Sequence, residues 1–203
     1  METDVSGRVV WITGAGSGIG RAMAAGFAAA GARVALTGRN RAALEETAAG
    51  CAGDPLVLPG DILDRAGMRG IVDAILAETG RLDILCANAG LNRPRRYWAD
   101  LAANPEAAWP EWDEVLDVNI KGLLNSIAAA LVPMRAQGDG QVIVTSSWAG
   151  RYNSQVAGVA YGAAKHATCD ICAQLNMQEG RNGIRATALN PAEVATPLLM
   201  KRP

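Results

Sequence analysis

A single histidine, His166, occurs in the 203 residues of this sequence, and its scarcity argues against several kinds of site. A Ser-His-Asp hydrolase needs a histidine as its general base, and zinc sites are built from clusters of histidine and cysteine. The four cysteines show no disulfide spacing, and the C-x-x-C pair of Cys169 and Cys172 has no second pair beside it. We therefore expect buried, reduced thiols and no bound metal.

The sequence also lacks an excess of charge of either sign. It has 19 lysines and arginines against 20 aspartates and glutamates, a formal net charge of -1. This balance gives no electrostatic reason to expect a nucleic acid or an anionic membrane as a partner. The first residues, METDVSGR, lack the layout of a secretory signal, and no apolar run approaches the roughly 20 residues of a membrane span. These absences favour a cytoplasmic protein.

Apolar, strand-like runs alternate with longer segments rich in alanine and leucine along the whole sequence. The six runs begin at Val9, Arg33, Pro55, Leu82, Gln141 and Ile184. Near-continuous apolar strands that alternate with helices are typical of a parallel sheet covered on both faces. With no repeat, linker or interior boundary, residues 1–203 are expected to form a single α/β domain with a doubly wound parallel sheet. Such sheets bind ligands at the carboxyl ends of their strands.

A glycine-rich loop, TGAGSGIGR, follows the first strand and opens a helix. Its spacing is Gly14-x-x-x-Gly18-x-Gly20, with Ser17 and Ile19 in between, and differs from the plain G-x-G-x-x-G fingerprint. Glycine lets another group approach the backbone, and the free N–H groups of a helix N-terminus attract an anion. The alternative is a merely flexible loop. Its place at the ligand-binding edge of the sheet favours the phosphates of a dinucleotide.

The second strand bears on which dinucleotide is bound. NAD usually needs an acidic residue about 20 positions after the loop, whereas an arginine accommodates the 2′-phosphate of NADP. No Asp or Glu occurs between Gly20 and Glu45, and Gly38 and Arg39 stand where the acid would be expected. We therefore predict NADP(H) as the preferred cofactor, with NAD(H) possible; the alternative for Arg39 is a solvated surface cation. Three more polar residues could add hydrogen bonds or charge: Ser17, Arg21 and Arg41.

Asp61 and Ile62 follow the third strand. The Asp61 carboxylate could accept a hydrogen bond from the adenine amino group, while the Ile62 backbone lines the same slot. The alternative is that Asp61 caps a helix beginning at Ile62, which is a common use of aspartate.

The segment YGAAK brings Tyr161 and Lys165 to one face of a helix, because they are four residues apart. A neighbouring ammonium stabilises the phenolate of a tyrosine and lowers its pKa, which makes it a usable acid or base. Ser146 and Ser147 end the fifth strand at the edge where a substrate would lie, and a serine there can hold a carbonyl oxygen. The alternatives are an amphipathic tyrosine beside a surface lysine, and ordinary turn serines.

Together these residues resemble the short-chain dehydrogenase/reductase family over residues 7–203, which implies a Rossmann-like fold. Six motifs match in the family's order: Thr13-Gly14-x-x-x-Gly18-x-Gly20, Asn88-Ala89-Gly90, Asn119, Ser147, Tyr161-x-x-x-Lys165, and Asn190-Pro191 through Thr196. The resemblance implies that Tyr161 is the acid/base and that Lys165 lowers its pKa and grips the nicotinamide ribose. It further implies that Ser147 orients the substrate oxygen, that Asn119 supports a water-linked proton relay to Lys165, and that Pro191, Val194 and Thr196 hold the nicotinamide.

The sequence departs from the family pattern in several places. Ala192 replaces a usual glycine, and the segment from Leu91 to Trp112 is longer than usual and carries Trp98, Trp109 and Trp112. These tryptophans could line a pocket or cover the core, and the core is favoured for Trp112. Family members generally continue beyond the nicotinamide loop into a lid helix and a last strand. Either the sequence is incomplete or the edge of the sheet is exposed.

The resulting hypothesis is an NADP(H)-dependent oxidoreductase that moves hydride between nicotinamide and a small-molecule secondary alcohol or ketone. The alternative is a non-catalytic nucleotide-binding sensor or scaffold with the same fold. The family resemblance further implies a homodimer or homotetramer.

Overall fold

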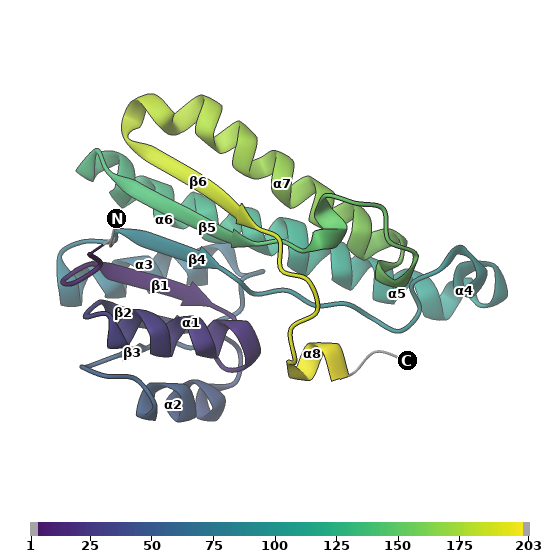
Figure 1. The fold of residues 1–203 in the computed structure, drawn as a ribbon, viewed down its shortest axis with the longest axis horizontal. Coiled ribbons are helices and arrows are strands. Elements are labelled where there is room, and N and C mark those ends of the chain that lie inside the picture. Colours follow the sequence, from purple (N-terminus) through teal and green to yellow (C-terminus); the bar gives the residue numbers. More distant parts are fainter. Residues whose placement is uncertain (1–3, 201–203) are drawn as a thin grey trace.

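The computed structural model describes residues 4–200, except for the side chains of residues 197 and 198. Its sheet has the order β3-β2-β1-β4-β5-β6 and every pair of neighbours is parallel (Figure 1). The strands are β1 (Val9–Thr13), β2 (Arg33–Thr37), β3 (Leu56–Val57), β4 (Ile84–Ala87), β5 (Gly140–Thr145) and β6 (Ile184–Leu189). The predicted doubly wound α/β fold is confirmed. The strand order reverses between β1 and β4, and this is where such folds bind their ligands.

Two helix layers cover the sheet. Helices α1 (Gly18–Ala29) and α2 (Arg41–Ala49) pack on one face, where the apolar core is built around Val10 and Ile12 of β1. Helices α3 (Arg65–Thr79), α6 (Leu123–Gln137) and α7 (Val159–Glu179) pack on the other face, around Trp11. Alternate side chains of β1 thus pack into the cores on opposite faces of the sheet, because successive side chains of a strand point to opposite faces.

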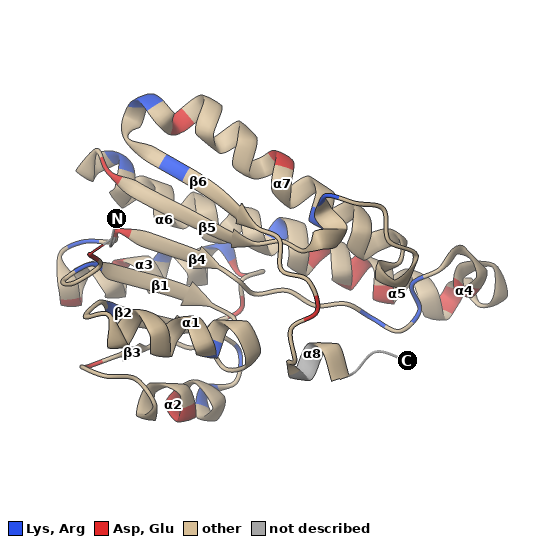
Figure 2. Ribbon diagram, viewed as in Figure 1, with Lys and Arg blue, Asp and Glu red and all other residues tan. Residues whose placement is uncertain are grey.

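The face on the side of α1 is open over β6. Ile184 and Ala186 are buried on the α7 side, whereas Arg185 and Thr187 are exposed. Figure 2 shows a basic segment on β6, and Arg185 is the one charged residue of this strand. The prediction of a sheet covered on both faces therefore holds for β1, β2 and β4 but is wrong for β6 within residues 4–200.

Helix α5 (Pro105–Leu116), a π-helical turn (Asp117–Gly122) and α6 form one continuous helical run. This run, Pro105–Gln137, contains an 18-residue window with a mean hydropathy of 1.5, which is long and apolar enough to cross a membrane by length and composition alone. Half of that window is buried in the fold, as in the core helices of soluble proteins.

The remaining helices are short and lie near the carboxyl edge of the sheet or at the end of α7. They are α4 (Trp98–Ala103), α8 (Pro197–Met200) and three 3-10 turns, Trp148–Gly150, Gln155–Ala157 and Gly180–Asn182. Helix α4 belongs to the long connection between β4 and α5, and the turn at Trp148–Gly150 follows β5 directly. Of these segments, the turns at Trp148–Gly150 and Gln155–Ala157 and helix α8 contribute residues that line the site.

Candidate active site

A cavity of about 610 Å³ lies along the carboxyl ends of the strands and gathers most of the residues predicted from the sequence. Those that line it are Gly14, Ser17, Gly18, Ile19, Arg39, Asp61, Ile62, Asn88, Ala89, Gly90, Ser147, Tyr161, Lys165, Pro191, Val194 and Thr196. Gly20 and Asn119 do not line the cavity, but each contacts residues that do. The residues predicted from the sequence therefore lie together around one cavity.

The glycine loop is pressed against the segment that follows β4. Gly14 has a φ of 67°, and a Cβ on it would lie 2.8 Å from Ala89 Cα. A Cβ on Gly20 would lie only 2.3 Å from the Gly14 carbonyl oxygen and 2.6 Å from the side-chain Nδ2 of Asn88. Both glycines are therefore needed for the close approach of backbone to backbone.

Helix α1 begins at Gly18 and presents its N-terminus to the cavity. Ser17 is the N-cap residue, its side chain makes no capping hydrogen bond, and the first turn has no acidic residue. The first N–H groups of a helix have no partner within the helix and attract an anion. The entrance to α1 is thus suited to a phosphate group.

Arg39 differs from its arginine neighbours because it lines the cavity and makes no ion pair with the described residues. Arg21 is occupied by a double hydrogen bond to Glu46, at 2.7 and 3.0 Å. Arg41 pairs with Glu45 one turn along α2. Of the three arginines noted in the sequence, Arg39 is the one available to a ligand.

Asp61 does not cap a helix, so that alternative is wrong. Its Oδ1 accepts a 2.9 Å hydrogen bond from the Leu63 N–H within a turn. Helix α3 begins three residues after Ile62, at Arg65, and Asp64 is its N-cap, accepting from the N–H groups of Ala66 and Gly67. Asp61 and Ile62 both line the cavity.

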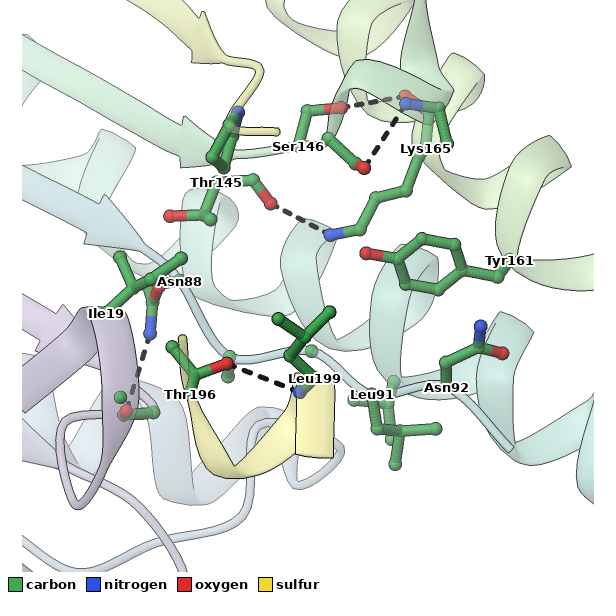
Figure 3. Close-up of a pocket in the computed structure, with 18 of the residues that line it drawn as sticks. Ile19, Asn88, Leu91, Asn92, Thr145, Ser146, Tyr161, Lys165, Thr196 and Leu199 are labelled. Carbon is green, nitrogen blue, oxygen red and sulfur yellow. Dashed lines mark hydrogen bonds between the residues drawn. The ribbon is translucent and has the colours of Figure 1, made fainter. Parts of the chain in front are cut away.

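Lys165 and Tyr161 lie together at the start of α7. The Lys165 Nζ lies 5.4 Å from the centre of the Tyr161 ring and donates a 2.8 Å hydrogen bond to the Thr145 carbonyl. Figure 3 shows the Tyr161 hydroxyl and the Lys165 ammonium directed into the same part of the cavity. Burial lowers the pKa of the Lys165 ammonium to about 8.

The two serines after β5 have different surroundings. The Ser146 hydroxyl donates to the Lys165 carbonyl at 3.0 Å and accepts from Thr168 at 2.8 Å, so it is tied to α7. The Ser147 hydroxyl accepts one hydrogen bond, from the Ala149 N–H, and lines the cavity. Ser147 is therefore the serine that can donate to a ligand.

Asn119 fixes the backbone beside Lys165. It lies in the π-helical turn between α5 and α6, and its amide exchanges hydrogen bonds of 2.7 and 3.1 Å with the main chain of Leu91. A Cβ on Gly90 would lie 2.6 Å from Asn119 Oδ1 and 3.5 Å from Lys165 Nζ. Asn119 and Lys165 thus approach the same glycine, and π-helical turns occur often at functional sites.

Thr145 adds a polar atom that the described residues do not satisfy. Its hydroxyl oxygen is buried, has no hydrogen-bond partner within the structure and belongs to a residue that lines the cavity. A buried polar atom of this kind calls for a partner from a ligand or a water. It lies beside the carbonyl that holds Lys165.

The sequence did not identify the residues at the end of the cavity nearest to Tyr161. The connection after β4 contributes Leu91, Asn92, Arg93, Pro94 and Arg96, and the segment after β5 contributes Trp148, Ser154 and Val156. The one signal for them was the unusual length of the segment from Leu91 to Trp112. The residues of this segment match no motif that would have marked them as part of a site.

The three tryptophans of this segment form a cluster outside the cavity. Trp112 is buried, donates its indole N–H to the Arg95 carbonyl and packs edge-on against Trp98 and Trp109, with ring centres 5.2 and 5.6 Å away. Trp98 and Trp109 are 65% and 50% exposed. The core position favoured for Trp112 is confirmed, and none of the three lines the cavity.

Comparison with protein families gives one match of nearly full length. The family model described as short chain dehydrogenase matches residues 8–203. It therefore covers the glycine loop, the cavity and both strand-end serines.

Individual relatives and solved structures agree with this match. The chain is 38% identical over 198 residues to the glycine betaine reductase ATRR of Emericella nidulans, of which it spans only 15%. It is 33% identical to the D-threitol dehydrogenase of Mycolicibacterium smegmatis, with 96% of this chain and 73% of that protein covered. A crystal structure of 3-ketoacyl-(acyl-carrier-protein) reductase from Brucella melitensis complexed with NADH superposes with a TM-score of 0.88, at 30% identity, covering 98% of this chain and 80% of that one.

Proposed function

Because this chain belongs to the short-chain dehydrogenase family, we propose that it is an NADP(H)-preferring oxidoreductase acting on a secondary alcohol or ketone. The observation that carries the proposal is the convergence of Tyr161, Lys165 and Ser147 on one cavity, beside a glycine loop that opens a helix. A purely structural role would not require these polar groups to meet where parallel strands end.

The cavity fits a dinucleotide. Ser17 and Gly18 line it at the N-terminus of α1, which offers N–H donors for a pyrophosphate, and the buried Thr145 hydroxyl lacks a partner among the described residues. Arg39 and Gly38 support the preference for NADP(H), because an arginine with no ion pair at this strand end suits a 2′-phosphate. When bound, the nicotinamide supplies or accepts the hydride.

The chain's own residues handle the proton. In reduction the Tyr161 hydroxyl gives its proton to the carbonyl oxygen, and in oxidation the phenolate removes the proton from the alcohol. Ser147 donates a hydrogen bond to the same oxygen. Lys165, with a pKa of about 8, is mostly an ammonium at neutral pH and stabilises the Tyr161 phenolate. Asn119 holds the main chain of Leu91 so that water can connect Lys165 to solvent.

Replacement of the acid/base tests this proposal. Tyr161→Phe should lower kcat by about a thousandfold, since it removes the transferred proton, while the Kd for NADPH stays unchanged. Tyr152→Phe alters an exposed tyrosine outside the cavity and serves as the matched control. Turnover by Tyr161→Phe at the wild-type rate would contradict the assignment of Tyr161.

The alternative, a non-catalytic nucleotide-binding protein, makes a different prediction. It requires tight NADPH binding together with no turnover of any ketone or secondary alcohol in a broad panel. A cytoplasmic location and a homodimeric or homotetrameric assembly stay predictions, because the structure describes one chain.

A further inference from the structure

Arg96 is a buried cation whose guanidinium makes no ion pair with the described residues. Within residues 4–200, four charged side chains are buried: Asp83, Arg96, Lys165 and Glu179. The two carboxylates are both bound by arginines, and Lys165 belongs to the proposed active site. Arg96 is only 5% exposed and makes no ion pair with any described residue.

The hydrogen bonds of Arg96 use only part of its capacity. Nη1 donates to the Val156 carbonyl at 3.1 Å, and Nε makes a long hydrogen bond of 3.4 Å to the Pro94 carbonyl. A guanidinium has five N–H donors and cannot be deprotonated in a protein. Burial of such a charge is unfavourable unless an anion compensates it. Two main-chain carbonyls do not supply that charge.

Arg96 lies beside the start of the helix that carries Tyr161. Its carbonyl accepts a 2.9 Å hydrogen bond from the Val159 N–H, and Gly158 packs so closely that a Cβ there would lie 2.4 Å from the Arg96 Cβ. Arg96 and Tyr161 line the same cavity. Figure 2 shows the basic residues of this connection gathered between β4 and α4.

The charges that line the cavity are mostly positive. Arg39, Arg93, Arg96 and Lys165 line it, and among the described lining residues Asp61 is the one carboxylate. Arg93 is neutralised by Glu114, and Arg39 lies with Asp61 where the nucleotide is proposed to bind. Arg96 is therefore the uncompensated charge at the end of the cavity formed by the long connection after β4.

We propose that Arg96 binds a carboxylate carried by the substrate, so that the proposed reaction interconverts a keto acid and a hydroxy acid. The inference rests on the proposed function and specifies its substrate class. The planar fork of a guanidinium matches the two oxygens of a carboxylate, and the hydrogen bonds are strengthened by both charges. A neutral ketone would leave the buried charge uncompensated.

A purely structural role does not account for the charge. The connection after β4 is joined to the start of α7 by the main chain of Arg96 and by its close packing on Gly158. A neutral donor could make the hydrogen bond to Val156. What the structural role leaves unexplained is a permanent cation with unused donors on a cavity wall.

The test compares the binding of acids with that of their amides. Pyruvate, levulinate and benzoylformate are each paired with the corresponding amide, which keeps the size of the ligand and removes its charge. Binding is measured to NADPH-saturated Tyr161→Phe protein, in which turnover is about a thousandfold slower, by the change in nucleotide fluorescence on mixing. Arg96→Met and Arg96→Lys are then made in the same background. Arg95→Met is the matched control, because Arg95 is paired with Glu111 and does not line the cavity.

At least one acid should bind about tenfold more tightly than its amide, as expected for a charge-assisted pair. Arg96→Met should abolish this preference, Arg96→Lys should retain part of it, and Arg95→Met should leave it unchanged. Acids that bind no better than amides, or a preference that survives Arg96→Met, would overturn the inference. NADPH binding is measured first, because its absence would overturn the proposed function and this inference with it, whereas NADPH binding without an acid preference overturns only the inference.

Discussion

The ammonium of Lys165 donates a 2.8 Å hydrogen bond to the carbonyl of Thr145, the last residue of β5. This contact joins the start of α7 to the carboxyl edge of the sheet and fixes the cation beside Tyr161. Burial at this position lowers the pKa of Lys165 from 10.5 to about 8. Burial of the Lys165 cation thus lowers the stability of the folded chain.

That cost predicts a pH dependence of stability. Between pH 8 and 10.5 the folded chain holds fewer protons at Lys165 than the unfolded chain does, so its stability rises with pH through this window. The gain is on the order of 3 kcal/mol, and below pH 8 the penalty is fully present. Lys165→Met should remove the rise, measured as the difference in free energy of unfolding by urea between the two proteins at each pH. Parallel pH profiles for wild type and Lys165→Met would contradict the prediction.

Arg39 predicts the preference between the two dinucleotides. Arg39→Gln should weaken NADPH binding by about tenfold, or 1.4 kcal/mol, and leave NADH binding almost unchanged, because only NADPH carries the 2′-phosphate. Equilibrium fluorescence titrations at one fixed salt concentration measure both affinities. Arg41→Gln is the control, since Arg41 is paired with Glu45 outside the cavity. An equal loss for both nucleotides would make Arg39 a general electrostatic contributor.

Two glycines of α1 give a matched pair of substitutions. Gly20→Ala forces a Cβ to within 2.3 Å of the Gly14 carbonyl, so the loop must shift; we expect a loss of about 1–3 kcal/mol of stability and much weaker NADPH binding. Gly26→Ala meets nothing within 4 Å on the exposed side of the same helix and should stabilise the chain by about 0.5–1 kcal/mol. Thermal unfolding and NADPH titration of both variants test the pair, and tolerance of Gly20→Ala would show that the loop is not tightly packed.

The fold and the position of the glycine loop at one end of the cavity could be predicted because their signals are local. The six apolar runs are continuous. Gly14 lies in the loop after β1 and Gly20 in the first turn of α1, and their spacing reflects direct backbone contact. The pair Tyr161 and Lys165 is separated by one helical turn, so its geometry follows from the helix alone. In such cases the separation of two residues along the sequence is enough to predict their distance in the structure.

The end of the cavity around Arg96 depends on long-range packing and could not be predicted in this way. Arg96 becomes buried because its main chain bonds to Val159, more than sixty residues later, and nothing in its neighbours signals this. The N-cap of α3 is Asp64 and not Asp61, for a related reason. Both aspartates precede the helix in the sequence, and the turn between them places Asp64 at the start of α3. The exposure of one face of β6 likewise could not be predicted, because it depends on which helices pack against that face.

Substitution of the adjacent serines Ser146 and Ser147 separates effects on stability from effects on catalysis. Ser147→Ala removes the hydroxyl that faces the cavity and should lower kcat/KM by about a hundredfold, with NADPH affinity unchanged, since the substrate oxygen loses a donor. Ser146→Ala removes the hydroxyl bonded to Lys165 and Thr168, and should cost about 1 kcal/mol of stability with a much smaller effect on kcat/KM. Steady-state kinetics of both variants check the predicted losses of kcat/KM, and urea unfolding of both variants checks the predicted loss of stability. A larger kinetic loss for Ser146→Ala than for Ser147→Ala would contradict the assignment of Ser147 as the donor to the substrate oxygen.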